Sequence, residues 1–345
     1  MRKGIIYIAL FSFFALVSFT STEPLFHVPS GWPKPSYDFS KNTLSQDKIN
    51  IGRALFYSPI LSKDNTISCA SCHLSFTGFA HTDHDLSHGI DGKIGKRNAP
   101  ALMNLAWGKT FMWDGRINHL DMQALAPISD SNEMNENIAH VVEKLNQSNL
   151  FKNLFYSAYR DSLITGERTL KCITQFMLTL VSANSKYDQV MRHEDTFSSQ
   201  EKNGYLLFQK NCASCHTEPL FTNNQFANNG LQQDTVLLDN GRYAITHIAS
   251  DSLTFKVPTL RNIEFTYPYM HDGRFKKLSQ VLNHYTSIPQ HASTLDSQLQ
   301  KPIQLSANDK VDVISFLLTL TDKEFLYHPK FQYPKKLFSQ SPNGL

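Results

Sequence analysis

Hydrophobic residues recur three and four positions apart in several stretches, the spacing that places side chains on one face of a helix. The clearest stretches are Ile51, Leu55 and Phe56; Leu170, Ile173, Phe176, Met177 and Leu180; Tyr205, Leu206 and Phe208; and Val311, Ile314, Leu317 and Leu318. Ser306 precedes the last stretch and Asp309 follows three positions later, which predicts an N-cap closed by a capping box. Strong alternation of apolar and polar residues does not occur, so we expect an all-α, mainly helical fold.

The chain contains an internal duplication. Four blocks occur twice in the same order, at 69–73 and 212–216, 100–104 and 258–262, 112–116 and 270–274, and 173–180 and 313–320. The middle two pairs share one offset of 158 positions. The duplication predicts two domains of one kind, at 23–195 and 196–345.

Length and composition agree with this organisation. A chain of 345 residues is long enough for two domains, or three at most. Hydrophobic residues make up 41% and charged residues 18%, which is typical of globular proteins. The 33 Lys and Arg residues exceed the 30 Asp and Glu residues by only three, so we expect no nucleic-acid partner.

The N-terminus has the pattern of a secretory signal. Arg2 and Lys3 precede an uncharged stretch whose apolar centre, residues 5–17, is shorter than the roughly 20 residues of a membrane span. Small residues follow at Ser18, Thr20, Ser21 and Thr22. We therefore interpret 1–22 as a signal peptide and expect a periplasmic protein, with an uncleaved N-terminal anchor as the alternative.

Two CxxCH motifs carry the candidate chemistry, Cys69, Cys72 and His73 and then Cys212, Cys215 and His216. CxxCH is the attachment signature of c-type haem, in which two cysteines form thioethers and the adjacent histidine is the proximal iron ligand. The motifs predict two covalently bound haem c groups, with His73 and His216 as iron ligands.

Two other interpretations of the cysteines are weaker. Cysteine pairs in a structural zinc site lie about 15–20 residues apart, whereas these pairs begin 143 positions apart. A redox disulfide within each CxxC would give no reason for the adjacent histidines. The fifth cysteine, Cys172, lies on an apolar helix face and is expected to be an inert core thiol.

Together these motifs resemble the bacterial dihaem cytochrome c peroxidase superfamily, which includes MauG-type enzymes, across nearly the whole chain after the signal. The resemblance is carried by both CxxCH motifs and by the runs at 97–100, 111–116, 258–262 and 269–273. It implies two cytochrome-c-like domains. The N-terminal haem would react with hydrogen peroxide, and the C-terminal haem would receive electrons from a small protein such as a cytochrome c or a cupredoxin. A homodimer is compatible with it, and the oligomeric state stays open.

The resemblance also implies specific site residues. The distal wall of the peroxide-binding haem would contain Gln123, Pro127 and Glu133, with Glu133 as general acid–base, and Trp113 would carry electrons between the haems. By the residues alone, a charge at a helix N-terminus is the simpler interpretation of Glu133, and Trp113 could equally be a core aromatic. The resemblance further implies one calcium ion between the domains, held by the Asn98 side chain and by two carbonyls, those of Thr266 and Pro268, with waters.

Three histidines, His81, His84 and His88, follow the first haem motif. In many relatives a loop histidine blocks the open iron, and His88 is nearest to that place. Solvated loop histidines are the simpler interpretation of all three.

The sixth ligand of the second haem is a further choice. Leu278, Val281, Leu282 and Tyr285 share one predicted helix face, and the position where peroxidases of this superfamily place a methionine holds Tyr285. Subtracting the offset of 158 from Tyr285 gives Pro127, which cannot bind iron. Tyr285 matches the MauG-type ligand, and the alternative is a structural tyrosine with Met270 as ligand. The surface tryptophan that MauG uses toward its protein substrate is replaced by Lys210.

Three functional hypotheses follow. The first is a dihaem c-type peroxidase that reduces hydrogen peroxide with electrons from a small redox protein. The second, favoured by Tyr285, is a MauG-like enzyme that oxidises side chains of a partner protein. The third is an electron carrier without catalysis, which would need six ligands on both irons and which Pro127 argues against.

Overall fold

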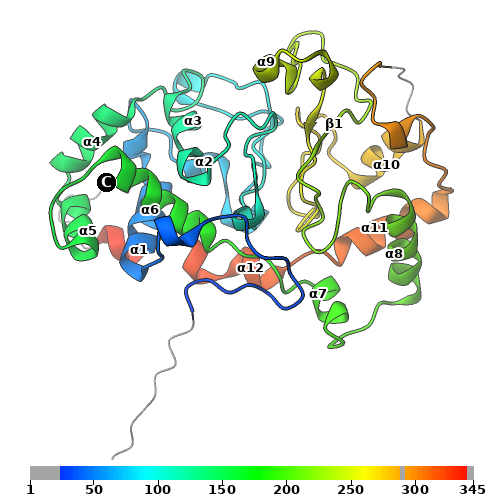
Figure 1. The fold of residues 1–345 in the computed structure, drawn as a ribbon, viewed down its shortest axis with the longest axis horizontal. Helices are drawn as coiled ribbons and strands as arrows, with labels where there is room; N and C mark the ends of the chain where they lie inside the picture. Colours follow the sequence, from blue (N-terminus) through cyan, green and yellow to red (C-terminus); the bar gives the residue numbers. More distant parts are fainter. Residues whose placement is uncertain (1–23, 288–291, 340–345) are drawn as a thin grey trace, which may run out of the picture.

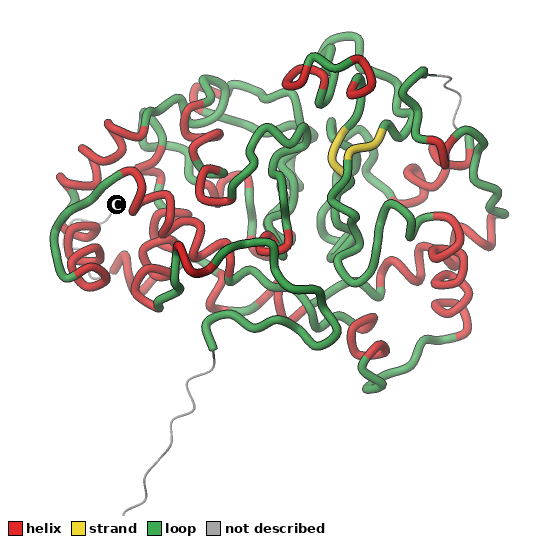
Figure 2. Tube along the Cα trace, in the orientation of Figure 1, coloured by secondary structure: helices red, strands yellow, loops and turns green. Residues whose placement is uncertain are grey.

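The computed structural model describes residues 24–287 and 292–339, and the predicted signal peptide at 1–22 lies outside them. Two helical units lie side by side (Figures 1 and 2). Helices of the first half are α1 Gln46–Tyr57, α2 Cys69–Cys72, α3 Leu125–Ser129, α4 Ile138–Gln147, α5 Asn149–Tyr159, α6 Gly166–Leu178 and α7 Lys186–Met191. Those of the second half are α8 Ser199–Asn211, α9 Tyr243–Thr246, α10 Leu278–Thr286, α11 Ala307–Leu318, α12 Lys323–Tyr327 and α13 Lys335–Ser339.

The predicted mainly helical fold is confirmed. Within the described residues the only sheet is a pair of antiparallel two-residue strands, β1 Phe226–Ala227 and β2 Phe255–Lys256. Over the same residues, every helix is too short or too polar to cross a membrane. Long loops, such as the one between α2 and α3, connect the helices (Figure 2).

The same helix crossing builds the core of each unit. In the first unit α1 packs on α6, and a Cβ added at Gly52 would overlap the carbonyl oxygen of Cys172. In the second unit α8 packs on α11, and a Cβ added at Gly204 would overlap the carbonyl oxygen of Asp312. Each glycine therefore permits a close approach of two helix backbones that any larger residue would prevent.

Most of the predicted helical faces are buried, and the Ser306–Asp309 capping box at the start of α11 is present. The prediction of which face of α11 is buried is partly wrong, because Val311 is 53% exposed whereas Val313 and Phe316 are buried. Leu206 on α8 is likewise 55% exposed. Leu206 and Val311 therefore lie outside the contact between α8 and α11 that includes Gly204.

The duplication extends to the turns. Asn104 and Asn262, which are 158 positions apart, both adopt left-handed backbone conformations, with φ of 57° and 56°. Each side-chain oxygen accepts a backbone N–H from the segment after the second core helix, at Ser182 in one unit and Asp322 in the other. The matching turns confirm two copies of one structural unit.

The C-terminal segment returns to the first unit. Phe325, Leu326, Phe331 and Phe338 belong to the same buried cluster as α1 and α6. Figure 1 shows α12 along the lower edge of the first unit. A division of the chain at residues 195 and 196 therefore does not separate the two cores, since the last segment completes the first one.

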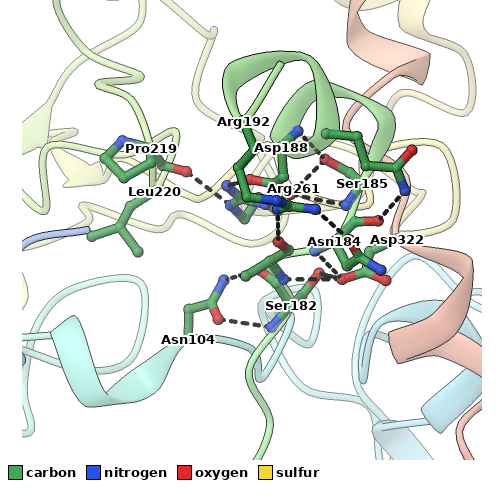
Figure 3. Close-up of polar contacts among 12 residues, drawn as sticks. Asn104, Ser182, Asn184, Ser185, Asp188, Arg192, Pro219, Leu220, Arg261 and Asp322 are labelled. Carbon is green, nitrogen blue, oxygen red and sulfur yellow. Dashed lines mark hydrogen bonds and ion pairs between the residues drawn. The ribbon is translucent and has the colours of Figure 1, made fainter. Parts of the chain in front are cut away.

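A buried polar network lies near the junction of the units (Figure 3). The fully buried Arg261 guanidinium donates to both carboxylate oxygens of Asp188 on α7, at 2.7 and 2.9 Å. Asp322 accepts from the Ser182 hydroxyl at 3.1 Å. Burial alone would raise the pKa of Asp188, but the hydrogen bonds and charge of Arg261 more than reverse this and hold it below its usual range. The network therefore keeps its charges paired away from water.

Candidate haem sites and the segment between them

A cavity of about 310 Å³ occupies the second unit and reaches the first. Its wall includes Cys212, Cys215 and His216, which follow α8. It also includes Tyr285 of α10. Asn98 and Trp113 of the first unit also line it. Concave, largely apolar cavities of this size bind cofactors or small molecules.

Both motif histidines have one ring nitrogen occupied. The Nδ1 atom of His73 lies 2.6 Å from the carbonyl oxygen of Phe79, and Nδ1 of His216 lies 3.2 Å from that of Phe221. A carbonyl can only accept, so each Nδ1 carries the proton and each Nε2 is left as a metal-binding atom. Burial lowers the pKa of His73 to about 4 and also lowers that of His216, so both rings are neutral, as an iron ligand must be.

All five cysteines are free thiols. Burial raises the pKa of Cys69 and of Cys212 to about 12, and neutral thiols are poor nucleophiles for disulfide exchange. This disfavours a redox role for the CxxC pairs. Cys172 is completely buried, with its sulfur 3.5 Å from the Tyr159 hydroxyl, so it is the core thiol expected from its helix face.

Both candidate ligands for the second iron lie in the cavity. Tyr285 projects from α10 on the predicted inward face, and Met270 occupies a left-handed turn with φ of 73°. The Met270 sulfur accepts a hydrogen bond from Asn229 Nδ2 at 3.4 Å. Burial raises the pKa of Tyr285 to about 12, against a smaller lowering by Asn229, so the phenol is protonated until a cation approaches it.

Trp113 is fixed from both units. Its indole N–H donates to the Asn98 carbonyl at 2.8 Å, and its own carbonyl accepts from the backbone N–H of Lys256 in β2 at 2.7 Å. The Asn98 N–H in turn donates to the carbonyl of His271, the counterpart of Trp113 in the second copy. These bonds hold the indole at the boundary of the units, beside the cavity.

Glu133 and Gln123 lie on the side of the first motif. The carboxylate of Glu133 is close enough to contribute to the raised pKa values of Cys69 and Cys72. Burial, with a smaller contribution from Asp130, raises the pKa of Glu133 to about 7. Gln123 is 8% exposed, and its Oε1 atom is buried without a hydrogen-bond partner among the described residues. A titrating carboxyl and an unsatisfied amide oxygen are typical of a ligand site.

The three loop histidines lie together, with ring centroids of His84 and His88 4.0 Å apart. His84 is exposed, as expected for a solvated loop residue, but His81 is only 5% exposed and that interpretation is wrong for it. The loop folds back onto the segment before Glu133, since Gly89 contacts the backbone of Asn132 closely. The His88 carbonyl accepts from the Cys72 thiol at 3.4 Å, so the loop borders the first motif.

The residues expected around calcium, Asn98, Thr266 and Pro268, all line the same cavity. Asn98 Nδ2 donates to the Asp85 carbonyl, which orients the side-chain amide. Within the described residues, no group of three or more His, Cys, Asp or Glu side chains could hold a metal ion. A cation between Asn98, Thr266 and Pro268 would be held by neutral oxygens and waters.

Comparison with known proteins places these motifs in a family. Residues 46–196 match the family model described as di-haem cytochrome c peroxidase, and residues 201–321 match that of cytochrome c. The methylamine utilization protein MauG of Methylorubrum extorquens is 33% identical over 86% of this chain and 83% of its own length. The chain belongs to the dihaem cytochrome c peroxidase family. Membership implies two haem groups, and the two neutral histidines beside two CxxC pairs fit them.

Two further proteins are similar to this chain over most of its length. The cytochrome c551 peroxidase of Nitrosomonas europaea is 32% identical over 84% of this chain and 83% of its own length. A crystal structure of a MauG-like protein associated with microbial copper homeostasis superposes with a TM-score of 0.79, at 28% identity, over 89% of this chain and 98% of that one. The similarity therefore extends over both units.

The structure reveals two charged groups that sequence reasoning missed in this member of the family. Arg97 lies within the quoted run 97–100, and it bridges Asp114 of the first unit, at 2.6 Å, to Asp239 of the second, also at 2.6 Å. Lys256 lies two positions before the repeated block at 258–262 and donates from Nζ to the Thr110 carbonyl at 2.6 Å. The sequence around Arg97 and around Lys256 gives no sign that either side chain would be buried rather than exposed to solvent.

Proposed function

We propose that this protein is a dihaem c-type cytochrome peroxidase that reduces hydrogen peroxide to two waters with two electrons from a small redox protein and two protons. One haem would be attached at Cys69 and Cys72 with His73 as iron ligand. The other would be attached at Cys212 and Cys215 with His216 as ligand. The neutral histidine rings and free thiols described above support both attachments.

One observation carries the assignment of roles to the two sites. α3 presents Pro127 at the position where the duplicated α10 presents Tyr285. Proline has no side-chain donor for iron, so a haem at the first site would keep an open coordination position. At the second site Tyr285 or Met270 could bind the iron. An open site suits peroxide binding, and a closed site suits electron transfer.

The first haem would supply the electrons that break the O–O bond. Glu133 would take the proton from the bound peroxide oxygen and return it to the departing oxygen. A pKa of about 7 suits both directions of this transfer at neutral pH. Gln123, with its unsatisfied buried oxygen, would accept a hydrogen bond from the peroxide or a site water. Trp113, held from both units, would carry electrons between the two sites.

A MauG-like activity is the second candidate, and Tyr285 favours it. A phenolate ligand stabilises ferric iron and would lower the potential of the second haem, opposite to the effect of methionine. Met270 is the alternative ligand, although its sulfur already accepts a bond from Asn229. Lys210 at the exposed end of α8 replaces the tryptophan that MauG uses, which disfavours the same protein substrate.

Four further features belong to the proposal. A calcium ion would bind Asn98, Thr266 and Pro268 between the units, and removal of calcium with a chelator would test it. Residues 1–22 would direct export to the periplasm, which cell fractionation and N-terminal sequencing would test. The segments 23–195 and 196–345 would each carry one haem, with the end of the second segment packed into the core of the first unit. Light scattering would decide between a monomer and a homodimer.

The test begins with the fully oxidised, haem-loaded protein. Hydrogen peroxide is added, the haem spectrum is followed, and reduced cytochrome c is then supplied. Rapid oxidation of the donor would support the peroxidase. A long-lived altered spectrum with little donor oxidation would favour the MauG-like activity. A ferric spectrum without high-spin haem would contradict both and leave an electron carrier.

Haem attachment is tested separately by intact mass and by pyridine haemochrome absorbance. The wild-type protein should carry two haems. The double variant Cys212→Ser, Cys215→Ser should carry one, because thioether bonds need the thiols. Retention of both haems by this variant would refute the attachment at the second motif.

A further inference from the structure

Lys256 is a cation without a carboxylate partner at the edge of the central cavity. Its backbone N–H holds the carbonyl of Trp113, and its ammonium donates to the Thr110 carbonyl at 2.6 Å. The side chain also borders the cavity that contains Cys212 and Cys215. Burial lowers the pKa of Lys256 to about 8, with no neighbouring charge contributing.

Other cations near the boundary of the units are paired. Arg97 contacts Asp114 and Asp239, and Arg261 contacts Asp188. Within the described residues no Asp or Glu oxygen lies within 4.0 Å of the Lys256 ammonium. An unpaired ammonium removed from water costs several kcal/mol or loses its proton. Its place on the cavity wall therefore favours an anionic group on the molecule that the cavity binds.

Two contacts hold the ammonium on the side away from the cavity lining. It donates to the Thr110 carbonyl, and it lies 5.6 Å from the centroid of the Phe111 ring. Lys256 lines the cavity, whereas Thr110 and Phe111 do not. Because an ammonium has three N–H donors, it can also donate to a carboxylate in the cavity.

The occupant of the cavity would bring such a group. A haem attached at Cys212 and Cys215 carries two propionate carboxylates on the edge of the porphyrin away from its thioether bonds. We propose that Lys256 is the counter-cation of a propionate of this haem. The inference rests on the attachment at the second motif stated under the proposed function.

Lys256 would then be a positioning residue with two effects. Its side chain would anchor the haem edge, while its backbone holds Trp113, so one residue would set the separation between the haem and the indole. Its positive charge would also disfavour ferric iron, which has one more positive charge than ferrous iron. Lys256 would therefore raise the midpoint potential of the second haem.

The test uses the haem-loaded full chain. Lys256→Met removes the charge and keeps the stem, and Lys256→Arg keeps the charge. Lys202→Met is the matched control, because it removes one charge from the exposed side of α8. For each protein we would measure haem content, both midpoint potentials by spectroelectrochemistry, and the propionate bending modes by resonance Raman spectroscopy.

Lys256→Met should retain two haems, lower one midpoint potential and shift one propionate mode. Lys256→Arg should restore most of both changes, and Lys202→Met should produce neither. Lys256→Gln should lower the same potential and shift the same mode, and it serves as the readout if Lys256→Met does not accumulate. Two attached haems with unchanged potentials and propionate modes in Lys256→Met would overturn this inference alone. Two haems retained by the Cys212→Ser, Cys215→Ser variant would overturn the attachment as well.

Discussion

Replacing Glu133 by Gln should abolish the pH dependence of the reaction with peroxide and slow it strongly. The substitution keeps the size of the side chain and removes its ability to accept a proton. Burial beside the first haem motif raises the pKa of Glu133 to about 7. The carboxylate form, which acts as the base, should therefore make up about one-tenth of the protein at pH 6 and roughly nine-tenths at pH 8.

The size of the effect follows from the role of the carboxylate. Loss of a positioned general acid–base typically costs 10²- to 10⁴-fold in rate, which corresponds to about 3 to 5 kcal/mol of activation free energy. In the wild-type protein the second-order rate constant should rise about tenfold per pH unit below pH 6 and level off above pH 8. In Glu133→Gln it should be low and flat over this range.

The assay is stopped-flow mixing of haem-loaded protein with excess hydrogen peroxide between pH 5 and pH 9. Asp130→Asn is the informative second variant, because the charge of Asp130 contributes to the raised pKa of Glu133. It should move the midpoint of the profile to lower pH and leave the plateau unchanged. If Glu133→Gln reacts within threefold of the wild type with the same midpoint, Glu133 is not the base.

Three other substitutions test ligand, packing and charge. Tyr285→Phe should remove any phenolate charge-transfer band, whereas an unchanged haem spectrum would refute Tyr285 as ligand and direct attention to Met270. Gly204→Ala should destabilise the second unit by about 1–3 kcal/mol in urea unfolding, because the added methyl group overlaps the backbone of α11. This net loss of stability would remain after the roughly 1 kcal/mol that alanine gains over glycine in helix propensity. Asn203→Ala on the exposed side of α8 is the control for propensity alone. Arg261→Met should cost about 3–5 kcal/mol by stranding the buried Asp188 carboxylate, and equal stability of the variant would contradict the pairing.

The sequence alone determined the features that depend on short spacings along the chain. The CxxCH motifs, the duplicated blocks and the helical periodicity predicted the attachment chemistry, the two-unit plan and the helices α1, α6, α8 and α11. The offset of 158 also paired Pro127 with Tyr285 and so predicted different roles for the two sites. These features are readable because bonded geometry and helix pitch fix which neighbours along the chain can act together.

Only the tertiary structure decided which residues from distant segments meet, and which of them lose contact with water. It placed the C-terminal segment in the core of the first unit, buried His81, and bridged the units through Arg97. It also left Lys256 without a carboxylate partner within the described residues. The nearly equal numbers of acidic and basic residues in the sequence do not indicate this. Burial and pairing arise from the packing of the whole chain, so they have no signature in the few residues around each group.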